Sequence, residues 1–115
     1  MKRKPFIAGN WKMHKTIAEA VSLVTSIIEK LPNPEQVEVG VAPPFTALSA
    51  VAARIGNSAL KLVAQNVFWE KEGAYTGEIS PLMLKDVGCE YVIVGHSERR
   101  QIFRETDEML SLIHI

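Results

Sequence analysis

Short apolar runs alternate along the chain with segments whose apolar residues recur at helical spacing. Four runs have the length and apolar content of strands, and they cover residues 5–9, 37–41, 60–65 and 91–94. Between them, apolar residues spaced by three and four predict helices over residues 17–31, 47–55 and 81–87. Strands that alternate with helices typically form a parallel sheet with helices outside it, so the pattern predicts an α/β fold.

Local signals predict where these helices begin and end. Thr16 and Glu19 have the spacing of a capping box, which places the start of the first helix at Thr16. Ser80-Pro81 supplies a capping hydroxyl and a first-turn proline for the third helix. Gly56 and Gly88 stand where glycine usually ends a helix.

The apolar runs also predict which strands are buried. Residues 5–9 read as a short buried strand. Residues 91–94 are nearly continuously apolar and rich in β-branched side chains, as in a strand buried on both faces of its sheet. Trp11 and Cys89 are predicted to pack rather than to bind a ligand.

Charge and cysteine content narrow the classes of partner. Thirteen basic and thirteen acidic residues give zero formal net charge, which provides no electrostatic footprint for nucleic acid or a membrane surface. An anionic ligand must therefore be held by local groups. The single cysteine excludes an internal disulfide, and no apolar run has the length of a signal-peptide core or a membrane span, so we expect a cytoplasmic protein.

Polar side chains follow three of the four predicted strands. Ligands of parallel α/β proteins bind at the carboxyl ends of the strands, so we expect these side chains to surround one site for a small polar or anionic substrate. Taken singly, each also fits a plainer interpretation, such as a solvated lysine, a surface histidine or a surface ion pair. The clusters are Asn10 with Lys12, Gln65 with Asn66, and His96 with Ser97 and Glu98.

Two longer motifs resemble the strand-end signatures of triosephosphate isomerases. Residues 8–13 (AGNWKM) resemble the first-strand signature, and residues 91–100 (YVIVGHSERR) resemble the fourth-strand signature. Residues 41–45 and 64–66 resemble the second and third signatures. The resemblance runs from about Lys4 to Met109, with the motifs in the order and spacing of the family.

This resemblance implies a (βα)8 TIM barrel, truncated here to roughly its first four βα units. It also implies the interconversion of dihydroxyacetone phosphate and glyceraldehyde 3-phosphate in glycolysis and gluconeogenesis, through an enediolate and without a cofactor or metal ion. His96 would be the electrophile, donating a hydrogen bond to the substrate carbonyl oxygen as a neutral imidazole. Lys12 would balance the phosphate and the developing oxyanion, and Asn10 would add an amide donor.

Other residues would support this site. Glu98 would position Lys12, and Ser97 and Gln65 would assist. The general base of the family is a glutamate at the end of the sixth strand, beyond the part of the barrel that this chain matches. We therefore expect the 115-residue chain alone to be inactive.

A dimer is implied by residues 73–80, which resemble the loop through which these enzymes form homodimers. Tyr75, Thr76 and Gly77 would make that contact, with Thr76 reaching into the partner's site. One position departs from the family, because Arg104 stands where glycine is usual. If that glycine needs a positive φ angle, the arginine would cost about 1 kcal/mol or more.

The last six residues, 110–115, show neither helical nor strand periodicity. They can be back-translated into a common sequencing-adapter string, so we expect the isomerase-like unit to be residues 4–109 and the remainder to be a non-native tail. A natural apolar helix end is the alternative. For the whole chain, the alternative to an isomerase segment is a non-catalytic half-barrel that binds or assembles with a partner.

Overall fold

Strands and helices alternate in the computed structural model, which describes residues 4–103 and residue 105. The elements are β1 (Phe6–Asn10), α1 (Ile17–Glu29), β2 (Glu38–Ala42), the 3-10 helix η1 (Phe45–Ala47), α2 (Leu48–Ile55), β3 (Lys61–Ala64), α3 (Pro81–Val87), β4 (Tyr91–Val92) and α4 (Ser97–Ile102). The predicted alternation is confirmed. Arg104 and residues 110–115, on which the predictions about a turn and a tail fall, lie outside the described residues.

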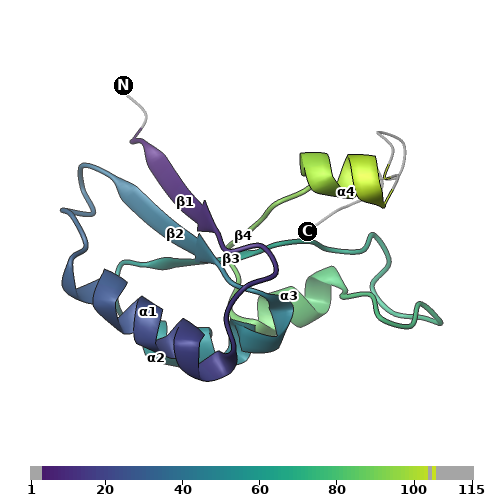
Figure 1. Ribbon diagram of the computed structural model, residues 1–115, viewed down its shortest axis with the longest axis horizontal. Coiled ribbons are helices and arrows are strands. Elements are labelled where there is room, and N and C mark those ends of the chain that lie inside the picture. The colour runs from purple at the N-terminus through teal and green to yellow at the C-terminus, as the bar shows by residue number, and fades with distance from the viewer. Residues whose placement is uncertain (1–3, 104, 106–115) are drawn as a thin grey trace.

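The four strands form one parallel sheet in the order β1-β2-β3-β4. Phe6 pairs with Glu38 and Asn10 with Ala42, while Val63 pairs with Tyr91. Because all strands run the same way, their carboxyl ends lie along one side of the sheet (Figure 1). The residues that follow β1, β3 and β4 are thereby brought to a common edge.

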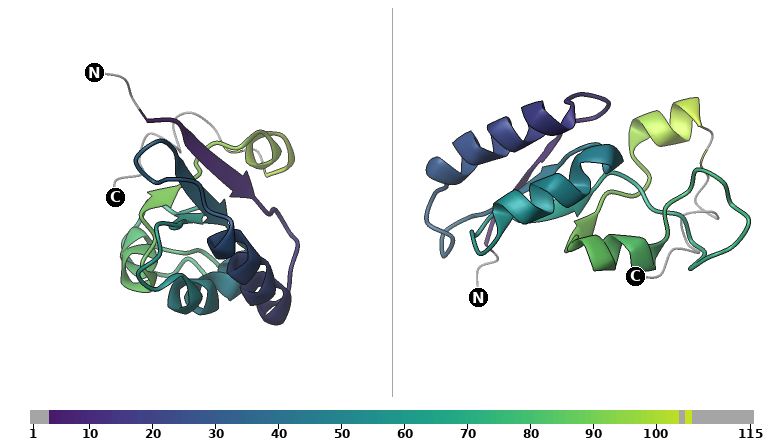
Figure 2. Two further views of the ribbon diagram at one scale, coloured as in Figure 1. Left: turned by 90° about the vertical axis from the view of Figure 1, so that its left-hand side faces the viewer. Right: turned by 90° about the horizontal axis from the view of Figure 1, so that it is seen from below.

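Three helices cover one face of the sheet. Figures 1 and 2 show α1, α2 and α3 on the same side, whereas α4 lies beyond the carboxyl ends of the strands. The core forms between these helices and the facing side chains of β2 and β3, where apolar residues are removed from water. Its buried members are Ala20, Val24, Val41, Ala47, Leu48, Val51, Leu60, Leu62, Ala64, Val67 and Leu84.

The predicted starts of α1 and α3 and the glycines predicted to end α2 and α3 are confirmed, whereas α1 ends at Glu29 and not at residue 31. Thr16 and Glu19 form the reciprocal capping box, and both the Thr16 amide and hydroxyl donate to Glu19 Oε1, at 3.0 and 2.9 Å. The Ser80 hydroxyl accepts from the Met83 amide at the start of α3, which ends at Gly88. These contacts satisfy backbone groups that have no partner within the helix.

The other face of the sheet carries a small aromatic cluster. The Phe6 and Tyr91 rings lie 4.6 Å apart, although their strands are not neighbours. Gly40, on the intervening strand β2, leaves room for this contact because it has no side chain. A Cβ there would lie 3.0 Å from carbon atoms of both Phe6 and Val63. The Tyr91 hydroxyl also donates to Glu38 Oε1 at 2.7 Å.

Two predictions about burial were wrong. The strand at residues 5–9 was expected to be buried, but β1 is largely exposed, with Ile7 at 61%. The strand at residues 91–94 was expected to be buried on both faces, but Tyr91 and Val94 are 41% and 46% exposed, and β4 ends at Val92. Both strands are at edges of the described sheet, so each has a strand neighbour on one side only.

Candidate active site

The first part of the site follows β1. Asn10 is the last residue of the strand, and its Oδ1 accepts a hydrogen bond of 2.9 Å from the Lys12 amide. Lys12 has a φ angle of +54°, in the left-handed region that residues other than glycine, asparagine and aspartate seldom adopt. This conformation costs about 1–2 kcal/mol, so the surrounding contacts must hold it in place.

The second part follows β4. The chain turns at Gly95, whose φ of +64° favours a residue without a side chain, and His96 then caps the N-terminus of α4. The Glu98 amide donates to His96 Nδ1 at 3.1 Å. A nitrogen that accepts this hydrogen bond carries no proton, so the proton of a neutral ring is on Nε2.

Glu98 connects the two parts. Its Oε2 lies 3.4 Å from Lys12 Nζ, and its Oε1 lies 3.2 Å from His96 Nδ1. The second contact gains charge–charge attraction only with a protonated ring, whereas the backbone hydrogen bond requires an unprotonated Nδ1. We favour the neutral ring, because the backbone donor is fixed in place by α4. The predicted convergence of Lys12, His96 and Glu98 is therefore present.

Gln65 directly follows β3. Its Nε2 donates to two backbone oxygens, those of Lys12 and Ala42, each at 2.8 Å. The amide thus bridges the segment after β1 and the end of β2.

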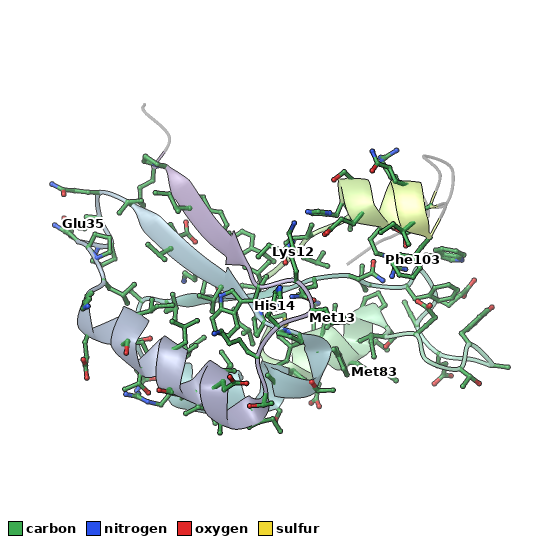
Figure 3. The ribbon with its side chains drawn as sticks, in the orientation of Figure 1. Lys12, Met13, His14, Glu35, Met83 and Phe103 are labelled. Atoms are coloured by element: carbon green, nitrogen blue, oxygen red, sulfur yellow. The ribbon has the colours of Figure 1, made fainter. Side chains whose placement is uncertain are left out.

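An open cavity of about 510 Å³ lies among these side chains. Figure 3 shows Lys12 and His14 at the end of β1 and Phe103 beneath α4. The size is within the range of small-molecule sites. The residues that line it are Asn10, Lys12, Met13, His14, Gln65, Asn66, His96, Glu98, Arg99, Ile102 and Phe103.

One wall of this cavity escaped prediction from the sequence. It is lined by Arg99 and Ile102 of α4 and by Phe103 at the C-cap of that helix, and their spacing of three and four residues was a signal that could have predicted them. Arg99 donates to Glu105 Oε2 through Nε and a terminal nitrogen, at 3.2 and 3.0 Å, and lies 4.5 Å from the centre of the Phe103 ring. His14 is exposed and also borders the cavity.

The structure does not bring every predicted site residue to the cavity. Ser97 begins α4 but is not among the lining residues. Tyr75, Thr76 and Gly77 are exposed and lie in the long loop that extends away from the sheet (Figure 1). That loop has internal order, because the Phe68 ring stacks on Trp69 and contacts Tyr75, at centroid distances of 4.1 and 4.6 Å.

Residues 4–103 and 105 offer neither a metal site nor a membrane-spanning helix. No three His, Cys, Asp or Glu side chains there gather closely enough to hold a metal ion. Within the same residues, none of the helices has the length and apolarity needed to cross a bilayer. Cys89 is partly buried against the core, and burial raises the pKa of its thiol to about 11, which favours the protonated thiol over the nucleophilic thiolate at neutral pH.

Comparison with known proteins identifies the family. The family model described as triosephosphate isomerase matches residues 5–113. The chain belongs to the triosephosphate isomerase family. Its parallel βα units are accordingly part of a TIM barrel, as the resemblance implied.

Named relatives agree with the family model. The triosephosphate isomerase of Dictyoglomus thermophilum is 55% identical over 109 residues, and that of Caldanaerobacter subterraneus subsp. tengcongensis is 59% identical over 109 residues. The enzyme of Trichlorobacter lovleyi is 51% identical over 110 residues. The alignments cover 95–96% of this chain but 44% of each of these three relatives, so the chain spans less than half of their length.

Proposed function

We propose that this chain supplies the carbonyl-polarising half of a triosephosphate isomerase active site, with dihydroxyacetone phosphate and glyceraldehyde 3-phosphate as its substrates. The observation that supports the proposal is the linked set of Lys12, Glu98 and His96, which borders one cavity together with Asn10. These residues come from two different strand ends. A cation, an imidazole and an amide around one point fit a phosphorylated carbonyl compound.

His96 has the role of electrophile in this proposal. With Nδ1 occupied by the Glu98 amide, Nε2–H is the donor that a substrate oxygen would meet. When a base removes a proton beside the carbonyl, negative charge collects on that oxygen. A fixed donor then stabilises the enediolate more than it stabilises the substrate, and so accelerates the reaction.

Lys12 and Asn10 supply the remaining polar contacts. The Lys12 ammonium group offsets the charge of the phosphate and of the enediolate oxygen. Asn10 Oδ1 is already bonded to the Lys12 amide, which orients the Asn10 side chain and leaves Nδ2 as its donor toward substrate. The reaction moves protons only, so neither a metal ion nor a cofactor is needed.

Glu98 acts on Lys12 rather than on substrate. Its two carboxylate oxygens face Lys12 Nζ and the His96 ring. The pair is about half exposed, so the attraction contributes little to stability, but it gives the flexible lysine a preferred direction. Ser97 would contribute only by starting α4 after His96.

A homodimer belongs to the same proposal. Tyr75, Thr76 and Gly77 lie exposed on an internally ordered loop, away from the cavity of their own chain. An exposed loop of this kind can insert into a second copy, and Thr76 would then support Asn10 and His96 of the partner. The predicted cytoplasmic location stays a prediction.

A non-catalytic binding or assembly module is the second candidate. It is favoured by the uncovered sheet face, where Phe6 and Tyr91 are 40% and 41% exposed. Such a face buries its apolar surface when another element covers it.

Turnover of an extended protein distinguishes the two candidates. Residues 1–109 of this chain would be joined to the C-terminal part of the Caldanaerobacter relative, in the region that this chain does not match. Our proposal predicts isomerase activity for the extended protein and none for the 115-residue chain. A folded but inactive extended protein would contradict the isomerase role and favour the module. Full activity in the unextended chain would contradict the proposal that this chain supplies only one half of the active site.

A further inference from the structure

The backbone of Lys12 is held at both of its polar groups by side chains. Its amide donates to Asn10 Oδ1 at 2.9 Å, and its carbonyl oxygen accepts from Gln65 Nε2 at 2.8 Å. These contacts surround a residue whose φ angle of +54° is unfavourable for lysine. A strained residue persists only where its surroundings impose the conformation.

Gln65 is suited to impose it because one amide nitrogen carries two hydrogens. One hydrogen bond goes to the Lys12 oxygen, and the other goes to the Ala42 oxygen at the end of β2, also at 2.8 Å. The same Ala42 oxygen accepts from the Trp11 amide at 3.1 Å. The segment carrying Lys12 is therefore tied to the sheet through Ala42 by two routes.

We propose that Gln65 is a positioning residue, which fixes the left-handed conformation of Lys12 and so directs its ammonium group into the site beside Glu98. Without the Gln65 donor, Lys12 would relax to negative φ, and Nζ would leave its place 3.4 Å from Glu98 Oε2. The conformational part of this inference stands on the hydrogen bonds alone. Its catalytic part rests on the proposed isomerase function.

The conformational part can be tested by NMR on the 115-residue chain. Gln65→Met keeps the length of the side chain and removes both donors, while Gln36→Met makes the same change at an exposed turn residue. A positive φ brings the amide hydrogen close to Hα and gives a strong cross-peak within Lys12. We expect this cross-peak to be strong in the unmodified chain and in Gln36→Met, and to weaken in Gln65→Met. An unchanged cross-peak in Gln65→Met would overturn the inference.

The unmodified chain provides a second measurement in case Gln65→Met does not fold. Both side-chain amide hydrogens of Gln65 should exchange with solvent more slowly than those of Gln36, because each is engaged with a carbonyl oxygen. Exchange at the rate of Gln36 would show that the two hydrogen bonds from Gln65 do not form and would overturn the inference.

The catalytic part is tested in the extended protein. Gln65→Met should lower kcat/KM by about 10–100-fold, because a misplaced catalytic group costs that order of rate. Values would be corrected for the folded fraction, so that a merely structural role leaves kcat/KM unchanged, and that result would overturn the positioning role. If the unmodified extended protein shows no turnover, the proposed function fails while the NMR result for Lys12 still stands.

Discussion

At the scale of single residues, the site depends on where one proton lies. The Glu98 amide assigns the lone pair of His96 to Nδ1 and the hydrogen of a neutral ring to Nε2. The ring can then donate to substrate without being charged, and α4 keeps it in that orientation. The role proposed for His96 therefore depends on a backbone contact as much as on the histidine itself.

Replacement of His96 tests this role. In the extended protein, His96→Gln should lower kcat by about 100-fold or more, as expected for the loss of an oxyanion donor, with a much smaller change in KM. Steady-state kinetics in both directions would measure the two constants. A raised KM with unchanged kcat would mean that His96 only binds the substrate.

Most of the polar residues at the candidate site, but not their geometry, could be predicted from the sequence. Asn10, Lys12 and His96 were predicted from their positions after strands and from the motifs, and all three border the cavity. The left-handed conformation of Lys12 and its bond to Gln65 could not be predicted, because they arise from the register between strands distant in sequence. Local sequence carries no information on that register.

At the scale of elements, the N-terminal caps of α1 and α3 are local features and were predicted correctly. The Ser80 hydroxyl accepts from the Met83 amide, and Ser80 is buried. Ser80→Ala should lower the free energy of unfolding by about 1 kcal/mol, since it leaves the Met83 amide without its side-chain acceptor. Urea unfolding would measure the change. Ser22→Ala, at an exposed position within α1, should cost nothing, and equal losses for both variants would contradict the capping role.

The cap of α1 should make helix stability depend on pH. Hydrogen bonds from the Thr16 backbone, and then from its hydroxyl, hold the pKa of Glu19 below its ordinary value of 4.5. The stabilising contribution of the ionised Glu19 carboxylate is therefore present above pH 4.5 and is lost as the pH falls through the lowered pKa. Unfolding measured between pH 3 and 7 should show a pH dependence that Glu19→Gln reduces. Identical pH profiles for the two proteins would contradict the assignment.

Strand burial could not be predicted as well as the caps, because it depends on neighbours rather than on local sequence. Residues 5–9 and 91–94 have the apolar content of interior strands, yet β1 and β4 lie at the two edges of the described sheet. The apolar content of a strand indicates that it is suited to burial, but its actual burial depends on which elements cover it. Exposed apolar edge strands favour pairing with an additional strand.

At the scale of the whole molecule, the proposed dimer depends on the loop that carries Thr76. Thr76→Glu replaces a small side chain by a larger, charged one where we expect Thr76 to enter the partner's site, so it should raise the dimer dissociation constant of the extended protein. Sedimentation velocity over a range of concentrations would measure it. Ser22→Glu adds the same charge at an exposed position on α1 and should leave association unchanged. Equal association of both variants would argue against this loop as the interface.

In the proposed isomerase, Asn10, Lys12 and His96 together polarise the carbonyl group of a bound triose phosphate. The infrared carbonyl stretch of dihydroxyacetone phosphate bound to the extended protein tests it most directly, because polarisation weakens the bond. We predict a lower frequency than for the free substrate, and a return toward the free value in His96→Gln. A bound substrate whose carbonyl frequency equals that of the free substrate would show that these residues do not polarise it.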